Sequence, residues 1–281
     1  MADFIVDLQH HSFLQHAVIV GILAAIPCGV IGTYVVTRRI TYIAGAIAHS
    51  VLAGLGAARY CQVVFHWSWL HPLYGAVAAS VVSALVIGLV SLFARQREDT
   101  VIGAVWAIGM AVGILFISRT PGYNEDLMSY LFGNILMVSS EDLRLILGLD
   151  ILILAFSLLF YNKLLVVCFD EEFARVRGIR VEIYYLLLLC LTALTVVLLV
   201  TVVGVVMVIA LLTLPVAVAC HFSNRLWLTM VLSAVLTVFF TLSGLALAYG
   251  PDLPAGATTI VLAGGIYLLV AAADAFRTRR S

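Results

Sequence analysis

Charged residues are scarce in this chain. Only 11% of its 281 residues are Asp, Glu, Lys or Arg, whereas 64% are hydrophobic. A soluble globular chain carries about 25% charged and about 45–50% apolar residues, so the polar surface here is too small to cover a water-soluble core. The formal net charge of zero also argues against a basic surface for nucleic acid. We therefore expect an integral membrane protein.

Several catalytic motifs are also missing. The single lysine, Lys163, is followed by Leu164, so the chain has no P-loop and cannot hydrolyse ATP by that route. No H-E-x-x-H or G-x-S-x-G motif occurs, which excludes the common zinc-protease and serine-hydrolase signatures. The five cysteines stand singly with no C-x-x-C pair, as expected of buried apolar residues. We expect a protein that is not itself an enzyme, and no stably bound cofactor.

Long apolar runs follow one another along the chain. A membrane-spanning helix needs about 20 mostly apolar residues, which predicts an all-α polytopic protein, a single membrane domain over residues 1–281. The sixth and seventh runs nearly touch, so a tight turn is required near Thr201–Gly204, and eight spans are an alternative to nine. The predicted spans are Leu14–Val36, Ile40–Tyr60, Leu73–Phe93, Val101–Ile117, Leu145–Tyr161, Val181–Val200, Val202–Cys220, Leu226–Tyr249 and Thr258–Phe276.

The basic residues give these spans a direction. Cytoplasmic loops of membrane proteins are enriched in Lys and Arg, and placing Arg38 and Arg39 inside puts twelve of the 15 basic residues on the same side. The remaining three are Arg59, Arg119 and Arg144. We therefore expect the N-terminus outside and the C-terminus in the cytoplasm.

Two of the connections between spans are predicted to contain a short helix. Residues 126–142 lie outside and contain an apolar stretch, Leu127–Val138, too short to cross the membrane, which predicts an interfacial or re-entrant helix. The cytoplasmic connection contains Phe169–Ile179, in which acids precede arginines, as suits the helix dipole. Gly178 offers a stop, and Phe169, Phe173 and Val176 form one apolar stripe. This pattern predicts a short amphipathic helix that docks a partner.

Two ionisable residues inside predicted spans are candidate functional residues, because such residues are costly in a bilayer. His49 lies near the middle of the second span, and a neutral imidazole is a common ligand of transition metals. Asp150 lies about two turns into the fifth span, where a cation in transit is one possible partner. Each residue could instead hydrogen-bond a facing helix.

Five sequence blocks, in order and spacing, resemble the membrane permease subunit of zinc/manganese ABC importers over nearly the whole chain. The resemblance implies a type II ABC importer fold, alternating access, and a metal that is substrate. The implied partners are a second permease copy, cytoplasmic ATPases and an extracytoplasmic metal-binding protein, at a bacterial-type plasma (inner) membrane. The blocks are 37–52, 126–133, 169–178, 203–217 and 254–256, and the residues implied to dock the ATPase are Phe169, Asp170, Glu171, Glu172, Phe173, Arg175, Arg177 and Gly178.

One position departs from the resemblance. The family often has an aspartate one helical turn before the span histidine, where this chain has Gly45. Zinc sites use three or four ligands, so a metal at His49 requires further ligands. We expect them from Asp150 or from a second His49 across a dimer interface. The alternatives are an ion-coupled secondary carrier, which predicts internal symmetry and paired mid-membrane charges, an intramembrane enzyme built on His49 and Asp150, and a structural membrane protein.

Overall fold

The fold is known from a computed structural model, which describes residues 7, 10–93, 97–121, 133, 138, 140–251 and 253–278. These residues form helices and connecting segments, with no strand among them. The helices are α2 (Ser12–Thr37), α3 (Thr41–Val64), α4 (Pro72–Phe93), α5 (Glu98–Arg119), α7 (Ser140–Leu159), α8 (Tyr161–Phe169), α9 (Glu171–Val176), α10 (Val181–Val203), α11 (Val205–Phe222), α12 (Leu226–Tyr249) and α13 (Ala255–Thr278). The all-α prediction is confirmed.

The number of membrane-spanning helices agrees with the sequence. Within the described ranges, eight helices are long and apolar enough to cross a bilayer. The segments 143–159 and 161–169, in α7 and α8, form a ninth candidate, bent by 71° at the break between them. The predicted range of eight or nine spans is therefore confirmed. The break follows Leu159, at the end of the fifth predicted span, and α8 occupies the start of the predicted cytoplasmic connection.

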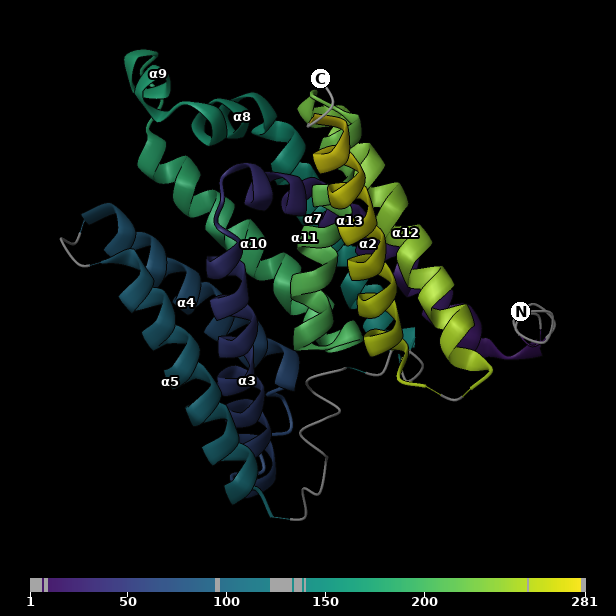
Figure 1. The fold of residues 1–281 in the computed structure, drawn as a ribbon. Helices are drawn as coiled ribbons and strands as arrows, with labels where there is room; N and C mark the ends of the chain where they lie inside the picture. The colour runs from purple at the N-terminus through teal and green to yellow at the C-terminus, as the bar shows by residue number, and fades with distance from the viewer. Residues whose placement is uncertain are drawn as a thin grey trace.

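The helices cross the molecule alternately between two ends. Figure 1 shows α8 and α9 at one end, here called the α9 end, where α13 also finishes. The opposite end, here called the far end, holds the turn between α10 and α11. Described basic residues at or beside the α9 end are Arg38, Arg39, Arg97, Lys163, Arg175, Arg177, Arg180 and Arg225, whereas Arg59, Arg119 and Arg144 belong to the far half. The predicted charge asymmetry between the ends is present.

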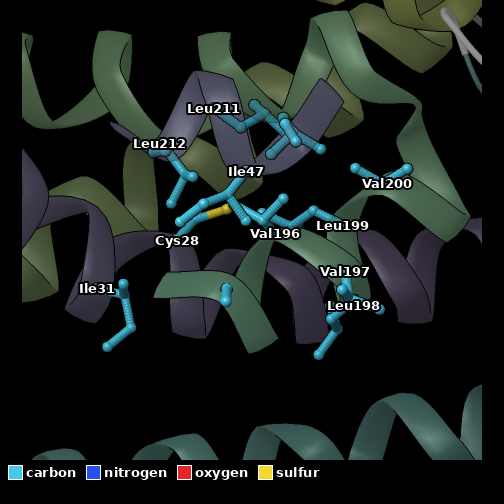
Figure 2. Close-up of a cluster of buried hydrophobic side chains, with 14 of the residues drawn as sticks. Cys28, Ile31, Ile47, Val196, Val197, Leu198, Leu199, Val200, Leu211 and Leu212 are labelled. Carbon is cyan, nitrogen blue, oxygen red and sulfur yellow. The ribbon is translucent and has the colours of Figure 1, made fainter. Parts of the chain in front are cut away.

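Helix α10 forms the centre of the core. It packs against α2, α3, α4, α7 and α11, and its side chains from Val196 to Val200 are buried. Figure 2 shows these residues beside Cys28 from α2, Ile47 from α3 and Leu211 from α11. Because lipid is as apolar as these side chains, close packing rather than water exclusion holds such helices together.

The turn between α10 and α11 is the one that the sequence requires. Gly204 separates the two helices with a φ of 81°, a backbone conformation that glycine adopts without steric cost. Gly133 lies against this turn, because a side-chain carbon there would meet the Val203 carbonyl carbon at 2.2 Å. The predicted helix at 127–138 lies outside the described residues, apart from Gly133 and Val138.

Helices α3 and α4 cross at a pair of glycines. A side-chain carbon on Gly54 would lie 2.0 Å from the carbonyl oxygen of Gly75, and one on Gly75 would lie 2.2 Å from that of Gly54. The backbones therefore touch, as small residues allow at membrane helix crossings.

We expect Gly54→Ala to destabilise the protein, because its methyl group must push two backbones apart. Overpacking of this kind costs about 1–3 kcal/mol of the free energy of unfolding. The control is Gly103→Ala, since nothing lies within 4 Å of a carbon added there. Thermal unfolding in mild detergent should show a lower midpoint for Gly54→Ala alone. Equal midpoints for both variants would contradict the crossing.

Candidate functional site

His49 stacks on an aromatic ring that the sequence did not single out. Its imidazole lies on Trp106 of α5, with ring centroids 4.4 Å apart and planes inclined by 19°. The side chain of His49 is half-buried, and its Nδ1 atom is buried without a hydrogen-bond partner among the described residues. A buried polar atom left unpaired is rare and calls for an explanation such as an ion or a moving part.

Close helix packing brings these two rings together. A side-chain carbon on Gly109 of α5 would lie 2.6 Å from the Cα of Ser50, and one on Gly113 would lie 2.7 Å from the Leu52 carbonyl carbon. The small glycines thus let α5 lie directly on α3. His49 is the ninth residue of α3 and Trp106 is the ninth residue of α5, and both helices start toward the α9 end. Both rings therefore lie about 12 Å along their helices, near the middle of a hydrocarbon layer about 30 Å thick.

Gly45 faces the same indole. A side-chain carbon at this position would lie 3.3 Å from Cζ3 of Trp106 and 3.7 Å from Cδ1 of Ile209. The space beside Gly45 is therefore taken by Trp106 and Ile209, on the same side as His49. At the position where the resemblance implies an aspartate, this chain has Gly45, packed against the indole of Trp106.

Asp150 lies in a different helix interface. Its helix, α7, packs against α2, α8 and α10, whereas α3 packs mainly against α4 and α5 and also contacts α2, α10 and α11. Asp150 is only 2% exposed, and neither carboxylate oxygen has a hydrogen-bond partner among the residues that the structure describes. Among the residues whose placement is described, no group of three or more His, Cys, Asp or Glu could hold a metal ion.

This placement predicts that Asp150 is not the partner of His49 within one chain. A buried carboxylate without a counter-charge is stable only when neutral, and asparagine has nearly the same shape as a neutral aspartic acid. We expect Asp150→Asn to keep transport within about twofold of wild type, a difference below about 0.5 kcal/mol. A loss of about tenfold or more in the same uptake assay would instead make Asp150 a residue of the path.

The predicted amphipathic helix is present in part, as the six-residue helix α9 with a cap at each end, whereas Phe169 is the last residue of α8. Oδ1 of Asp170 accepts a hydrogen bond from the Phe173 N–H at 2.9 Å, which makes it an N-cap. At the other end Gly178 has a φ of 73°. The N–H of Ile179 donates to the Ala174 carbonyl at 3.0 Å, and that of Gly178 to the Arg175 carbonyl at 3.0 Å. This pair of bonds is the Schellman motif, so the helix ends where the sequence predicts.

The apolar stripe beside this helix faces outward. Phe169 is 63% exposed, Phe173 45% and Val176 86%, whereas Ala174 on the other face is fully buried. The Arg177 guanidinium lies 4.8 Å from the centroid of the Phe173 ring. Glu171 and Glu172 lie in the first turn and Arg175 in the last, in keeping with the helix dipole. An exposed apolar stripe rimmed by charges is typical of a protein-binding surface.

These features define a class: a polytopic α-helical membrane protein with a broken span and a capped amphipathic helix at one end. The family description "ABC 3 transport family" matches residues 10–274. The chain belongs to this family. It is therefore a membrane permease component of an ABC transporter, and the resemblance seen in the sequence is confirmed.

Individual relatives cover most of the chain. The chain is 41% identical over 241 residues to the "Probable metal transport system membrane protein" of Chlamydia pneumoniae, covering 86% of this chain and 82% of the relative. It is 37% identical over 266 residues to the "Manganese transport system membrane protein MntC" of Halalkalibacterium halodurans, covering 95% and 89%. Among solved structures, "PsaBC from Streptococcus pneumoniae in complex with Fab" is similar with a TM-score of 0.84 and 30% identity, covering 96% of this chain and 94% of the other.

Proposed function

We propose that this chain is the permease subunit of an ATP-driven importer of a divalent transition metal, manganese or zinc. The observation that carries the proposal is the exposed stripe of Phe169, Phe173 and Val176. The chain has no P-loop in its sequence, so energy has to come from a separate ATPase. The family membership and the metal transport named for the relatives agree with this assignment.

The orientation follows from the two ends. The α9 end holds most of the described basic residues and the docking stripe, so we assign it to the cytoplasm of a bacterial-type cell, at the inner membrane. The C-terminus then lies inside and the N-terminus outside. Exposed histidines in the far half, His10, His11, His66 and His71, would face an extracytoplasmic binding protein that delivers the metal.

His49 is the proposed metal contact of the path. It lies near mid-membrane, half-buried, with an unpaired ring nitrogen. One imidazole is a weak site, which suits an ion that must leave as readily as it enters. A second copy of the chain is the proposed source of further ligands, because zinc and similar ions prefer three or four. Alternating access then requires the ATPase to move the helices on either side of His49.

Reconstitution tests this function. The chain is placed in liposomes with or without its ATPase, and uptake of radioactive manganese is measured against zinc as competitor. We expect uptake only when the ATPase and ATP are present. Uptake by the chain alone, driven by an ion gradient, would instead support the ion-coupled secondary carrier.

A further inference from the structure

A polar cavity of about 300 Å³ lies beside α9, at the cytoplasmic end assigned above. It is lined by side chains from α3, α4, α5, α9 and α10 and from the turn between α2 and α3. Charged and hydroxyl groups meet there, including Arg38, Glu171, Glu98, Ser91 and Tyr185. The docking helix α9 therefore lines the same cavity as α3 and α5, the helices that hold His49 and Trp106.

Side-chain contacts connect the elements around this cavity. Arg38 forms an ion pair with Glu171 of α9, and its guanidinium lies 5.6 Å from the ring centroid of Tyr185 on α10. Across the same cavity, Ser91 of α4 donates a hydrogen bond of 2.8 Å to Glu98 at the start of α5. Arg38 therefore contacts both the docking helix and the central helix of the bundle.

Arg38 lies in the short turn between α2 and α3. Arg38 caps the C-terminus of α2, where its N–H donates to the Tyr34 carbonyl at 2.9 Å. The next residue, Arg39, has a φ of 63°, a conformation that non-glycine residues rarely adopt. Helix α3 begins two residues later, at Thr41. The turn is therefore short and tightly constrained, so a displacement of Arg38 is passed directly to α3.

A second ion pair of α9 is local in sequence. Arg175 contacts Glu182 of the adjoining helix α10 at 3.0 Å, and Val167, Ala174 and Val181 form a small apolar cluster beneath. These contacts fix α9 to its own neighbours. The pair between Glu171 and Arg38 joins α9 to an element 133 positions earlier in the chain, so it links α9 to the helix that carries His49.

We propose that Arg38 is a positioning residue that couples the docking helix to the metal path through its ion pair with Glu171. A push on α9 by the ATPase displaces Glu171, which pulls Arg38 and the start of α3, and with it His49. This inference rests on the proposed function. The side chains of Arg38 and Glu171 are 23% and 37% exposed, and such a pair adds little to stability. Its removal should therefore affect coupling more than folding.

The test uses the full complex of this chain with its ATPase in liposomes, and measures manganese ions imported per ATP hydrolysed. We expect Arg38→Gln to lower this ratio about fivefold or more, the lower range of allosteric coupling, while the ATPase still co-purifies. Glu171→Gln should lower the ratio by the same factor in the complex that forms. Arg38→Lys keeps the charge and should retain most of the ratio. The charge-swapped double variant, Arg38→Glu with Glu171→Arg, should restore it.

Arg225→Gln is the matched control, because it removes the same charge at the α9 end outside the cavity. Unchanged ratios in the single variants would overturn the coupling role, as would an Arg38→Lys variant that behaves like Arg38→Gln. Impaired single variants without rescue by the swap would overturn the ion pair as the link. If the wild-type complex itself shows no ATP-dependent import, the proposed function fails, a result separate from these.

Discussion

Replacing His49 with alanine is expected to reduce ATP-dependent manganese uptake by about tenfold or more, equivalent to at least about 1.4 kcal/mol. His49 is the only histidine near the middle of a described span, and its Nδ1 atom has no hydrogen-bond partner in the part of the chain that the structure describes. The stack on Trp106 holds the ring in place, so the imidazole is ready to bind an ion without first being ordered. Removing it leaves the middle of the path without this proposed ligand.

The control for this prediction is His221→Ala. His221 lies at the α9 end, where its Nδ1 is 2.8 Å from the Ala217 carbonyl oxygen of its own helix, so its loss should leave uptake near wild type. Co-purification of the ATPase and basal ATP hydrolysis should survive in both variants, which separates loss of the path from loss of the fold. Wild-type uptake by His49→Ala would remove His49 from the path.

The packing around Gly45 explains why this position, one helical turn before His49, does not carry a carboxylate. An aspartate at residue 45 would begin 3.3 Å from the edge of Trp106, a contact closer than ordinary packing allows. The indole and a carboxylate therefore compete for one space. Under the proposed function, a second copy of the chain or water carried with the ion supplies the further ligands.

The sequence predicted most of the fold because each signal was local. Apolar length located the spans, the near contact of two apolar runs required a turn at Thr201–Gly204, and Gly178 marked the end of α9. Each depends on residues within a few positions of each other, so no knowledge of the packing was needed.

The pairing of helices could not be predicted in this way. The spans are apolar nearly all round, and such helices do not show which face meets which neighbour. The stack of Trp106 on His49 therefore could not be predicted, although each ring belongs to the ninth residue of its helix. The separation of Asp150 from His49 could not be predicted for the same reason, because it depends on α7 packing against α2 and α10 while α3 packs mainly against α4 and α5.

Replacing Val176 with aspartate is expected to abolish stable association with the ATPase. Val176 is 86% exposed, so a charge there costs the isolated chain almost nothing. In a complex that buries the stripe, the same carboxylate would lose its water without gaining a partner. Residues at the centre of an interface contribute about 2 kcal/mol or more, so affinity should fall by about thirtyfold. Co-purification of tagged chain with ATPase measures this directly.

Asn162→Asp is the matched control, since Asn162 is exposed on α8 and lies off the stripe. It adds the same charge at the same end of the molecule, and should leave the complex intact. Both variants should insert and unfold like wild type. Retention of the ATPase by Val176→Asp would show that the partner docks elsewhere at the α9 end. Loss of the ATPase with both variants would instead point to a general effect of negative charge, because only the stripe distinguishes the two positions.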